Sequence, residues 1–265
     1  MSFYRFHSNK LGIYEAVEKD CLRDDRRRIG KADGAWLPRV GASYPGAISF
    51  WTEYGLKKYL ESGLQDWHRR VTQCPLEIHV VEEIRDFLYS DEYQVICKPE
   101  SISSKQVMTW PGLAKKLAVS SIKNKVVAYI TRITHGQKEI LVFDHEKQWS
   151  EAGTQVPAGT VDPEESLHEA LLREIAEETG ISELQILAKI DEYIFYRTPH
   201  QEFNHRHIFE LTSQEPLPDR WEHQVTGHGI DDGMKFYFYW MPLSEAKMKI
   251  SGGMGDSLCK LVEEI

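Results

Sequence analysis

The sequence predicts an α/β protein in two parts, and three observations support this prediction. In the C-terminal part, β-rich runs flank one long helical segment at 163–179, which is typical of a mixed sheet packed by helices. The first hundred residues combine a helical apolar stripe with short apolar runs, which indicates an α+β fold. The composition is 41% hydrophobic and 28% charged, so a chain of 265 residues can form a sizeable core.

One helix and two strands are predicted in the N-terminal part. Thr52 can cap a helix through about residue 70, since apolar residues follow it at helical spacing: Leu56, Leu60, Leu64, Trp67 and Val71. Residues 75–82 and 93–98 are predicted strands, with a short helix at 81–89 as the alternative. Residues 30–46, rich in glycine and proline, are expected to form loops.

A polar segment that begins with proline, residues 99–105, is the predicted domain boundary. It divides the chain into an N-terminal α+β domain of unknown role, residues 1–105, and a second domain, residues 106–265. Residues 120–125 form a second candidate boundary.

The second domain is expected to contain several strands and two helices. Residues 125–134 and 139–144 resemble a hairpin, and further strands are expected at 185–197, 206–212 and 234–242. In the last of these, alternate aromatic side chains should face the core. A C-terminal helix is expected near residues 256–264.

Composition and charge exclude several classes of function. The net charge of −9 disfavours tight, non-specific binding to nucleic acid, which requires basic surface. The four cysteines are widely spread and form no CxxC pair, which disfavours a cysteine zinc site and indicates reduced thiols. Neither a secretory signal nor a long apolar run is evident, so we expect a cytoplasmic protein without a membrane segment.

Helix 163–179 has recognisable start and stop signals. Asp162 is the expected N-cap, with Pro163 in the first turn and Glu165 placed to complete a capping box. Gly180 should end the helix in a left-handed conformation. The buried face is expected to consist of residues four apart, Leu167, Leu171 and Ile175.

Three carboxylates crowd the last turns of this helix. Glu174 and Glu178 are four residues apart, and Glu177 is three residues from Glu174. Like charges at these spacings destabilise a helix by about 0.2–0.5 kcal/mol per pair, and acids near a C-terminus also oppose the helix dipole. The cluster therefore suggests a bound cation, and its oxygen ligands favour Mg²⁺ or Mn²⁺ over zinc.

Residues 159–181 resemble the Nudix box, G-x5-E-x7-R-E-U-x-E-E-x-G-U, where U is a bulky aliphatic residue, and all nine defined positions match. The resemblance implies a Nudix α/β/α sandwich that hydrolyses a pyrophosphate linkage. It implies metal ligation by the side chains of Glu174, Glu177 and Glu178 and by the carbonyl of Gly159. It also implies that Arg173 orients the acidic cluster; this arginine is four residues from both Glu169 and Glu177.

The identity of the general base stays open between a residue of the box and an acid in a later loop. Glu174 is one candidate, and a glutamate from a later loop, Glu222, is the other, with Asp231 and Asp232 behind it. Among the other polar residues, His205 and His207 would share one face of a strand, but their spacing does not suggest a metal site, so structural roles are expected.

The resemblance implies a nucleotide-type substrate, a nucleoside diphosphate linked to another group. Capped or triphosphorylated RNA ends stay among the candidates, because they contain the same linkage. The alternative is a Nudix-fold module that senses a ligand or binds RNA with little catalysis; the intact carboxylate set argues against it. Whether the chain forms a homodimer stays open.

Overall fold

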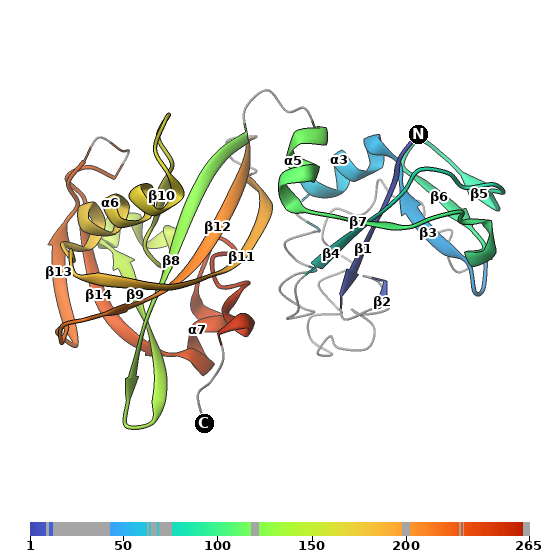
Figure 1. The fold of residues 1–265 in the computed structure, drawn as a ribbon. Coiled ribbons are helices and arrows are strands. Elements are labelled where there is room, and N and C mark those ends of the chain that lie inside the picture. Colours follow the sequence, from blue (N-terminus) through green and yellow to red (C-terminus); the bar gives the residue numbers. More distant parts are fainter. Residues whose placement is uncertain are drawn as a thin grey trace. The chain divides into compact units, whose positions relative to one another are not determined.

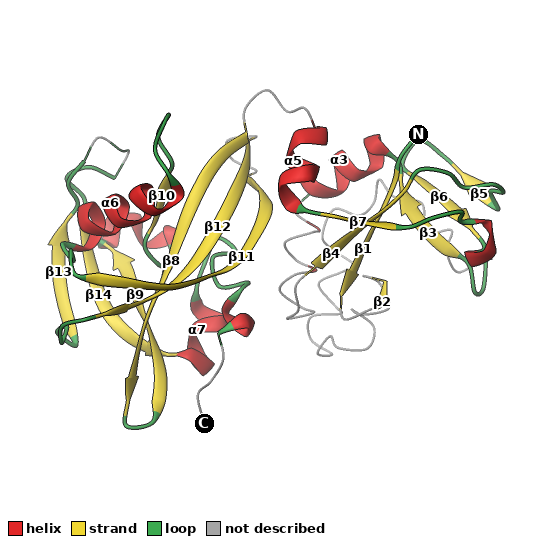
Figure 2. Ribbon diagram, in the orientation of Figure 1, coloured by secondary structure: helices red, strands yellow, loops and turns green. Residues whose placement is uncertain are grey.

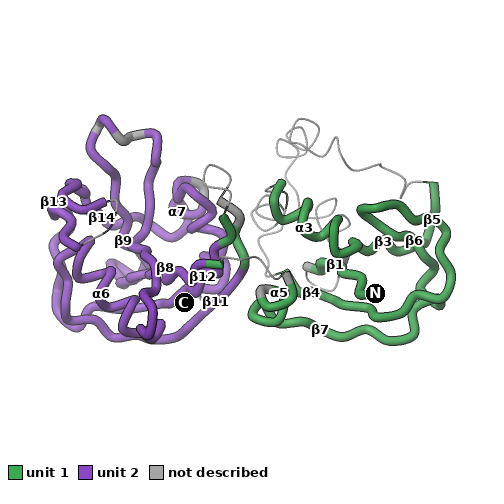
Figure 3. The backbone as a smooth tube through the Cα atoms, turned by 90° about the horizontal axis from the view of Figure 1, so that it is seen from above, with its two compact units in different colours: residues 1–122, 194–203 green, residues 123–193, 204–265 purple. Residues whose placement is uncertain are grey.

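The computed structural model describes every residue except 9–10, 13–42, 63, 65–67, 69–75, 118–121, 198–201, 228, 230 and 262–265. The chain forms two compact units (Figure 3): residues 1–122 with 194–203, and residues 123–193 with 204–265. The division after residue 105 stays a prediction. No helix among the described residues is both long and apolar enough to cross a membrane.

The N-terminal unit contains an antiparallel sheet with the strand order β5-β6-β3-β1-β4-β7, and β2 also pairs with β1. The strands are β1 (Phe3–Ser8), β2 (Leu11–Gly12), β3 (Ile48–Trp51), β4 (Leu76–Val81), β5 (Tyr89–Ser90), β6 (Gln94–Cys97) and β7 (Gln106–Met108). The predicted strands at 75–82 and 93–98 are confirmed. The alternative helix at 81–89 is wrong, because the chain leaves β4 at Val81 and forms an isolated bridge from Ile84 to Ile102.

Among the described residues of this unit, the helices α3 (Glu53–Glu61) and α5 (Trp110–Leu117) accompany the sheet, and a short 3-10 turn occupies Pro99–Ser101. Thr52 caps α3 as predicted, since its side chain accepts a hydrogen bond of 3.0 Å from the Gly55 N–H. Leu56 and Leu60 are buried, which confirms the apolar stripe within α3. The helix predicted through about residue 70 is wrong in its length, because α3 ends at Glu61 with Ser62 as its C-cap, and the buried Leu64 lies beyond that end. Trp67, Val71 and most of the predicted loop at 30–46 lie outside the described residues.

The C-terminal unit is built on a sheet with the order β11-β12-β8-β9-β14-β13, and β10 pairs with β8. Its strands are β8 (Ile122–Thr134), β9 (Gln137–His145), β10 (Ala158–Thr160), β11 (Leu184–Arg197), β12 (Glu202–Ser213), β13 (Arg220–Gln224) and β14 (Lys235–Pro242). The strands predicted in this part are all present. The turn between β8 and β9 consists of His135 and Gly136, both with positive φ (53° and 77°), as in a tight hairpin turn.

Two layers of helix cover this sheet, which confirms the predicted α/β sandwich (Figures 1 and 2). Helix α6 (Leu167–Thr179) packs on one face through a shared core with β8, β9, β12 and β14. Helix α7 (Leu243–Lys249) and the turns after it lie on the other face, where the Tyr129 hydroxyl of β8 donates to the Met254 carbonyl. In β14, Phe236 and Phe238 are buried while Tyr237 is exposed, so the expected alternation is confirmed.

The C-terminal helix expected near 256–264 is wrong in the described part of that range. Turns lead into a 3-10 helix of only three residues, Leu258–Lys260. The reason is local: the Ser257 hydroxyl and the Lys260 ammonium both bind the carboxylate of Asp191 on β11, which ties this segment to the sheet. Helix α7 was not predicted from the sequence.

Candidate active site and metal centre

Helix α6 presents the acidic residues, and it begins later than predicted. Its N-cap is Ser166, whose hydroxyl accepts from the Glu169 N–H (3.2 Å) while the Glu169 carboxylate accepts from the Ser166 N–H (2.8 Å). The predicted cap at Asp162 is wrong, because Glu164 has a φ of 69° and a right-handed helix cannot pass through it. Residues 162–165 form a closed turn instead, in which the Glu165 carboxylate accepts from the Asp162 N–H.

We expect Ser166→Ala to destabilise the first turn of α6. The substitution removes the hydroxyl that satisfies the Glu169 N–H, a loss of about 1 kcal/mol at an N-cap. Hydrogen exchange of the α6 amides measures it, with Ser182→Ala in the exposed segment after the helix as the control. Equal protection in both variants would show that Ser166 does not cap the helix.

The C-terminal end of α6 is as predicted. Gly180 has a φ of 77° and its N–H donates to the Ala176 carbonyl. Leu171 and Ile175 are buried and Leu167 is partly buried against the same core, so the predicted apolar face is confirmed. This packing fixes the position of the helix that carries Glu174, Glu177 and Glu178.

Arg173 is the centre of an ion-pair network. Its guanidinium binds both oxygens of Glu165, with Nε–Oε1 at 2.8 Å and Nη2–Oε2 at 2.9 Å, and this pairing lowers the pKa of Glu165 to about 2. The same guanidinium is 3.1 Å from Glu174 and 3.3 Å from Glu177, and it donates to the Thr160 carbonyl. Glu169, which is also four residues from Arg173, takes no part in this network, because its carboxylate accepts from the Ser166 N–H at the start of the helix.

Glu174 and Glu178 are carboxylates in an environment short of water. Burial raises the pKa of Glu178 well above its usual range, although the Ala158 N–H donates to its carboxylate at 3.1 Å. Burial also raises the pKa of Glu174, and the charge of Arg173 opposes this effect. A buried acid and a partly buried acid whose charges repel each other are electrostatically costly unless a positive charge is shared between them.

Gly159 lies directly against Glu174. It pairs with Val126 in the β10–β8 ladder, and a Cβ added to it would lie 1.7 Å from the Glu174 carboxyl carbon. A second glycine has the same relation to Glu177: a Cβ on Gly227 would lie 2.7 Å from its Oε2. Glycine at both positions lets the backbone approach the carboxylates closely.

The predicted ligands are linked as neighbours: Gly159 lies against Glu174, Arg173 contacts Glu174 and Glu177, and the Ala158 N–H donates to Glu178. The donor set consists of oxygen atoms only, two of its side chains are desolvated, and Arg173 keeps the cluster in position. These residues fit a hard divalent cation such as Mg²⁺ or Mn²⁺. The individual ligand roles stay predictions.

Strand β13 joins the end of α6 through side-chain contacts. The Trp221 indole N–H donates to the Thr179 carbonyl, and His223 Nε2–H donates to the Glu177 carbonyl, both at 3.1 Å. Side chains alternate along a strand, so Glu222 lies on the opposite face from these two residues. Its carboxylate is 3.2 Å from the Lys235 ammonium and is exposed.

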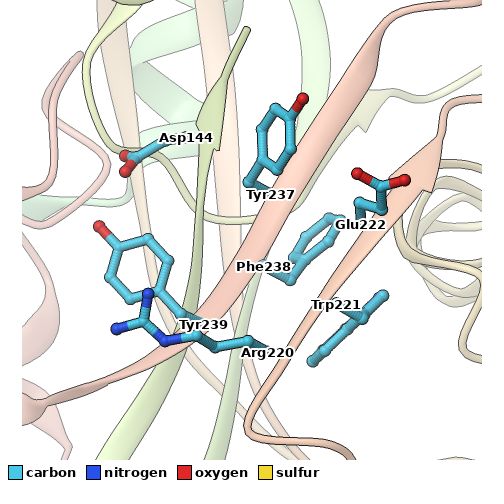
Figure 4. A pocket seen from close by; sticks show the side chains of 7 residues that line it. All are labelled: Asp144, Arg220, Trp221, Glu222, Tyr237, Phe238 and Tyr239. Atoms are coloured by element: carbon cyan, nitrogen blue, oxygen red, sulfur yellow. The ribbon is translucent and has the colours of Figure 1, made fainter.

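Glu222 lines a pocket on the sheet (Figure 4) that is walled by side chains from three strands: Asp144, Arg220, Trp221, Glu222, Tyr237, Phe238 and Tyr239. The structure does not bring Glu222 into contact with the box carboxylates, and its role as a general base stays a prediction. Asp231, in contrast, interacts electrostatically with the box, because its negative charge contributes to raising the pKa of Glu178. The sequence did not indicate this pocket, because strand pairing assembles it: Tyr237 lies opposite Asp144, and Tyr239 opposite Arg220.

Comparison with known proteins adds partial matches. The chain is 39% identical over 59 residues to an RNA pyrophosphohydrolase of Wolbachia pipientis subsp. Culex pipiens (strain wPip), which covers 22% of this chain and 33% of that protein. An RNA pyrophosphohydrolase of Wolbachia sp. subsp. Brugia malayi (strain TRS) is 37% identical over 59 residues, 22% of this chain and 34% of that protein. The chain spans about a third of the length of these curated relatives.

Among solved structures, a C. elegans Ap4A hydrolase binary complex is similar at 20% identity and a TM-score of 0.41, covering 52% of this chain and 94% of the other. A MutT NUDIX hydrolase from Burkholderia pseudomallei is similar at 16% identity and a TM-score of 0.41, covering 54% and 100%. The family model of the NUDIX domain matches residues 123–260, 138 of the 265 residues, and the chain therefore belongs to the NUDIX family.

Proposed function

We propose that this protein is a metal-dependent hydrolase that cleaves a pyrophosphate linkage in a nucleoside diphosphate joined to another group. The observation that supports it best is the pair formed by the buried Glu178 and the partly buried Glu174, which Arg173 contacts and which lies against Gly159. A surface cluster of acids would be solvated and would need no cation. This cluster is partly desolvated, so a divalent cation would remove its electrostatic cost.

Bound between these carboxylates, Mg²⁺ or Mn²⁺ would supply positive charge to the phosphates and lower the pKa of a coordinated water. The side chains have separate tasks. Glu174, Glu177 and Glu178 bind the cation, and Arg173 orients two of them through its contacts at 3.1 and 3.3 Å. For the general base we retain Glu174 and Glu222 as candidates, with Asp231 supported by its electrostatic effect on Glu178.

The proposal also covers the class of substrate, which is a small nucleotide or the end of an RNA. The partial similarity to proteins named RNA pyrophosphohydrolase is a reason to keep triphosphorylated RNA ends, beside small nucleotides, among the candidates that we propose. A cytoplasmic location and a homodimer stay predictions.

A substrate panel tests the proposal. The full-length protein is incubated with nucleoside triphosphates, dinucleoside polyphosphates, nucleotide sugars, dinucleotides and RNA carrying a 5′-triphosphate or a cap, each with Mg²⁺, Mn²⁺ or EDTA. We expect turnover of at least one class that requires the metal and releases products cut between two phosphates. Tight binding without hydrolysis across the whole panel would contradict the proposal and support the sensing alternative.

A further inference from the structure

A second group of potential metal ligands lies on strands β11 and β12, outside the residues of the Nudix box. His205 and His207 are two residues apart on β12, and Glu192 lies on the neighbouring strand β11. Both imidazoles are buried, each with a side-chain exposure of 7%, and Glu192 is partly exposed at 24%. A buried imidazole nitrogen calls for a partner that satisfies it.

The three side chains converge on one point. Glu192 Oε2 is 3.5 Å from His205 Nε2 and 3.4 Å from His207 Nδ1, and the three ligand atoms all lie within 4.8 Å of one another. These two imidazole nitrogens are buried and have no hydrogen-bond partner among the described residues. In a tetrahedral site with bonds of ~2.0–2.1 Å, neighbouring ligand atoms are ~3.3 Å apart, close to the spacing from the carboxylate to each ring.

A residue behind the trio orients one ring. His207 Nε2 lies 3.1 Å from Asn124 Oδ1 on β8, and a carbonyl oxygen can only accept, so this nitrogen carries the proton. In a neutral imidazole the other nitrogen, Nδ1, then has its lone pair directed towards Glu192. A ligating histidine that donates its second N–H to an oxygen is the usual arrangement in metal sites.

We propose that Glu192, His205 and His207 form a second metal site, separate from the acidic cluster of the box, that takes a divalent transition metal of the zinc class. Two imidazoles and one carboxylate suit Zn²⁺, Fe²⁺ or Ni²⁺, whereas the all-oxygen set of the box suits Mg²⁺ or Mn²⁺. Three protein ligands leave a coordination position for water or for an oxygen of a bound molecule.

One neighbouring positive charge, that of Lys189, occupies the side of Glu192 that a metal would need. The Lys189 ammonium is 2.6 Å from Glu192 Oε2, the same oxygen that faces both histidines. A cation in the site would have to displace this ammonium, so Lys189 competes with the metal. Removing the charge should therefore strengthen metal binding, which a purely structural role for the trio would not produce.

The test measures Zn²⁺ binding to the full-length protein by calorimetry, with excess Mg²⁺ present to occupy the box. The wild type is expected to bind one equivalent. Glu192→Gln and His207→Gln should each weaken binding about 100-fold or more, Asn124→Ala about 10–100-fold, and Lys189→Met should tighten it. Cobalt substitution adds a spectroscopic readout, since the absorption of Co²⁺ at a site with nitrogen ligands should disappear in the same ligand variants.

Two controls separate this site from others. His135→Asn removes an exposed imidazole from the β8–β9 turn, where asparagine tolerates the positive φ of 53°, and should leave Zn²⁺ binding unchanged. Glu178→Gln should also keep the Zn²⁺ equivalent, so loss of hydrolysis and loss of this site remain distinguishable. Wild-type affinity in both Glu192→Gln and His207→Gln, with Lys189→Met unchanged, would overturn the proposal.

Discussion

Glu178→Gln is expected to lower Mg²⁺-dependent hydrolysis by about 1,000-fold or more while the fold stays intact. Metal stabilisation of developing phosphate charge is worth several kcal/mol, and ~4 kcal/mol corresponds to about 1,000-fold in rate. Glutamine has nearly the same shape and still accepts the Ala158 N–H, so the loss would come from the missing charge. Turnover of the panel substrate that is cleaved best measures it.

The same substitution has a predicted effect on stability without metal. Burial raises the pKa of Glu178 in the folded state, so above the usual pKa of glutamate the folded protein binds more protons than the unfolded protein. Stability then falls as the pH rises through this region. In EDTA, Glu178→Gln should therefore melt at a higher temperature than the wild type near neutral pH, and the difference should shrink towards acidic pH.

Added Mg²⁺ should raise the melting temperature of the wild type and not that of Glu178→Gln, because only the ionised side chain binds the cation. Glu183→Gln, an exposed acid just beyond the box, is the matched control and should behave as the wild type. Retained turnover in Glu178→Gln would contradict the assignment of Glu178 to the metal site.

Gly159→Ala is expected to reduce hydrolysis by about 100-fold or more through geometry alone. The new methyl group would lie 1.7 Å from the Glu174 carboxyl carbon, so either the carboxylate or strand β10 has to move by an ångström or more. Displacements of this size in a catalytic group cost about 100-fold in rate. Mg²⁺ titration of activity checks the cause, since a displaced ligand should also raise the Mg²⁺ concentration needed.

Gly229→Ala is the matched control, because the nearest atom to a Cβ at that position is 3.9 Å away. It should keep activity and melting temperature close to those of the wild type. Wild-type activity in Gly159→Ala would mean that Glu174 does not need its position beside β10.

Short-range patterns account for the parts of the fold that were predicted correctly. Thr52 as a cap, Gly180 as a helix end and the alternating aromatic residues of 235–242 each depend on neighbours a few positions away. The errors arise where a tertiary contact or a backbone angle overrides the pattern. Glu164 adopts a left-handed conformation and delays α6, and Asp191 holds the C-terminal segment in turns.

By itself, the sequence determined membership of the NUDIX family and the acidic residues of the box, because a helix places Glu174, Glu177 and Glu178 at fixed relative positions. Only the tertiary structure decided which charged groups contact these residues and how far each carboxylate is buried. Burial of Glu178, the contact of Gly159 with Glu174, and the convergence of Glu192 with His205 and His207 all join segments distant in the chain. Such contacts depend on strand order and register, and a spacing along one strand carries no information about the strand beside it.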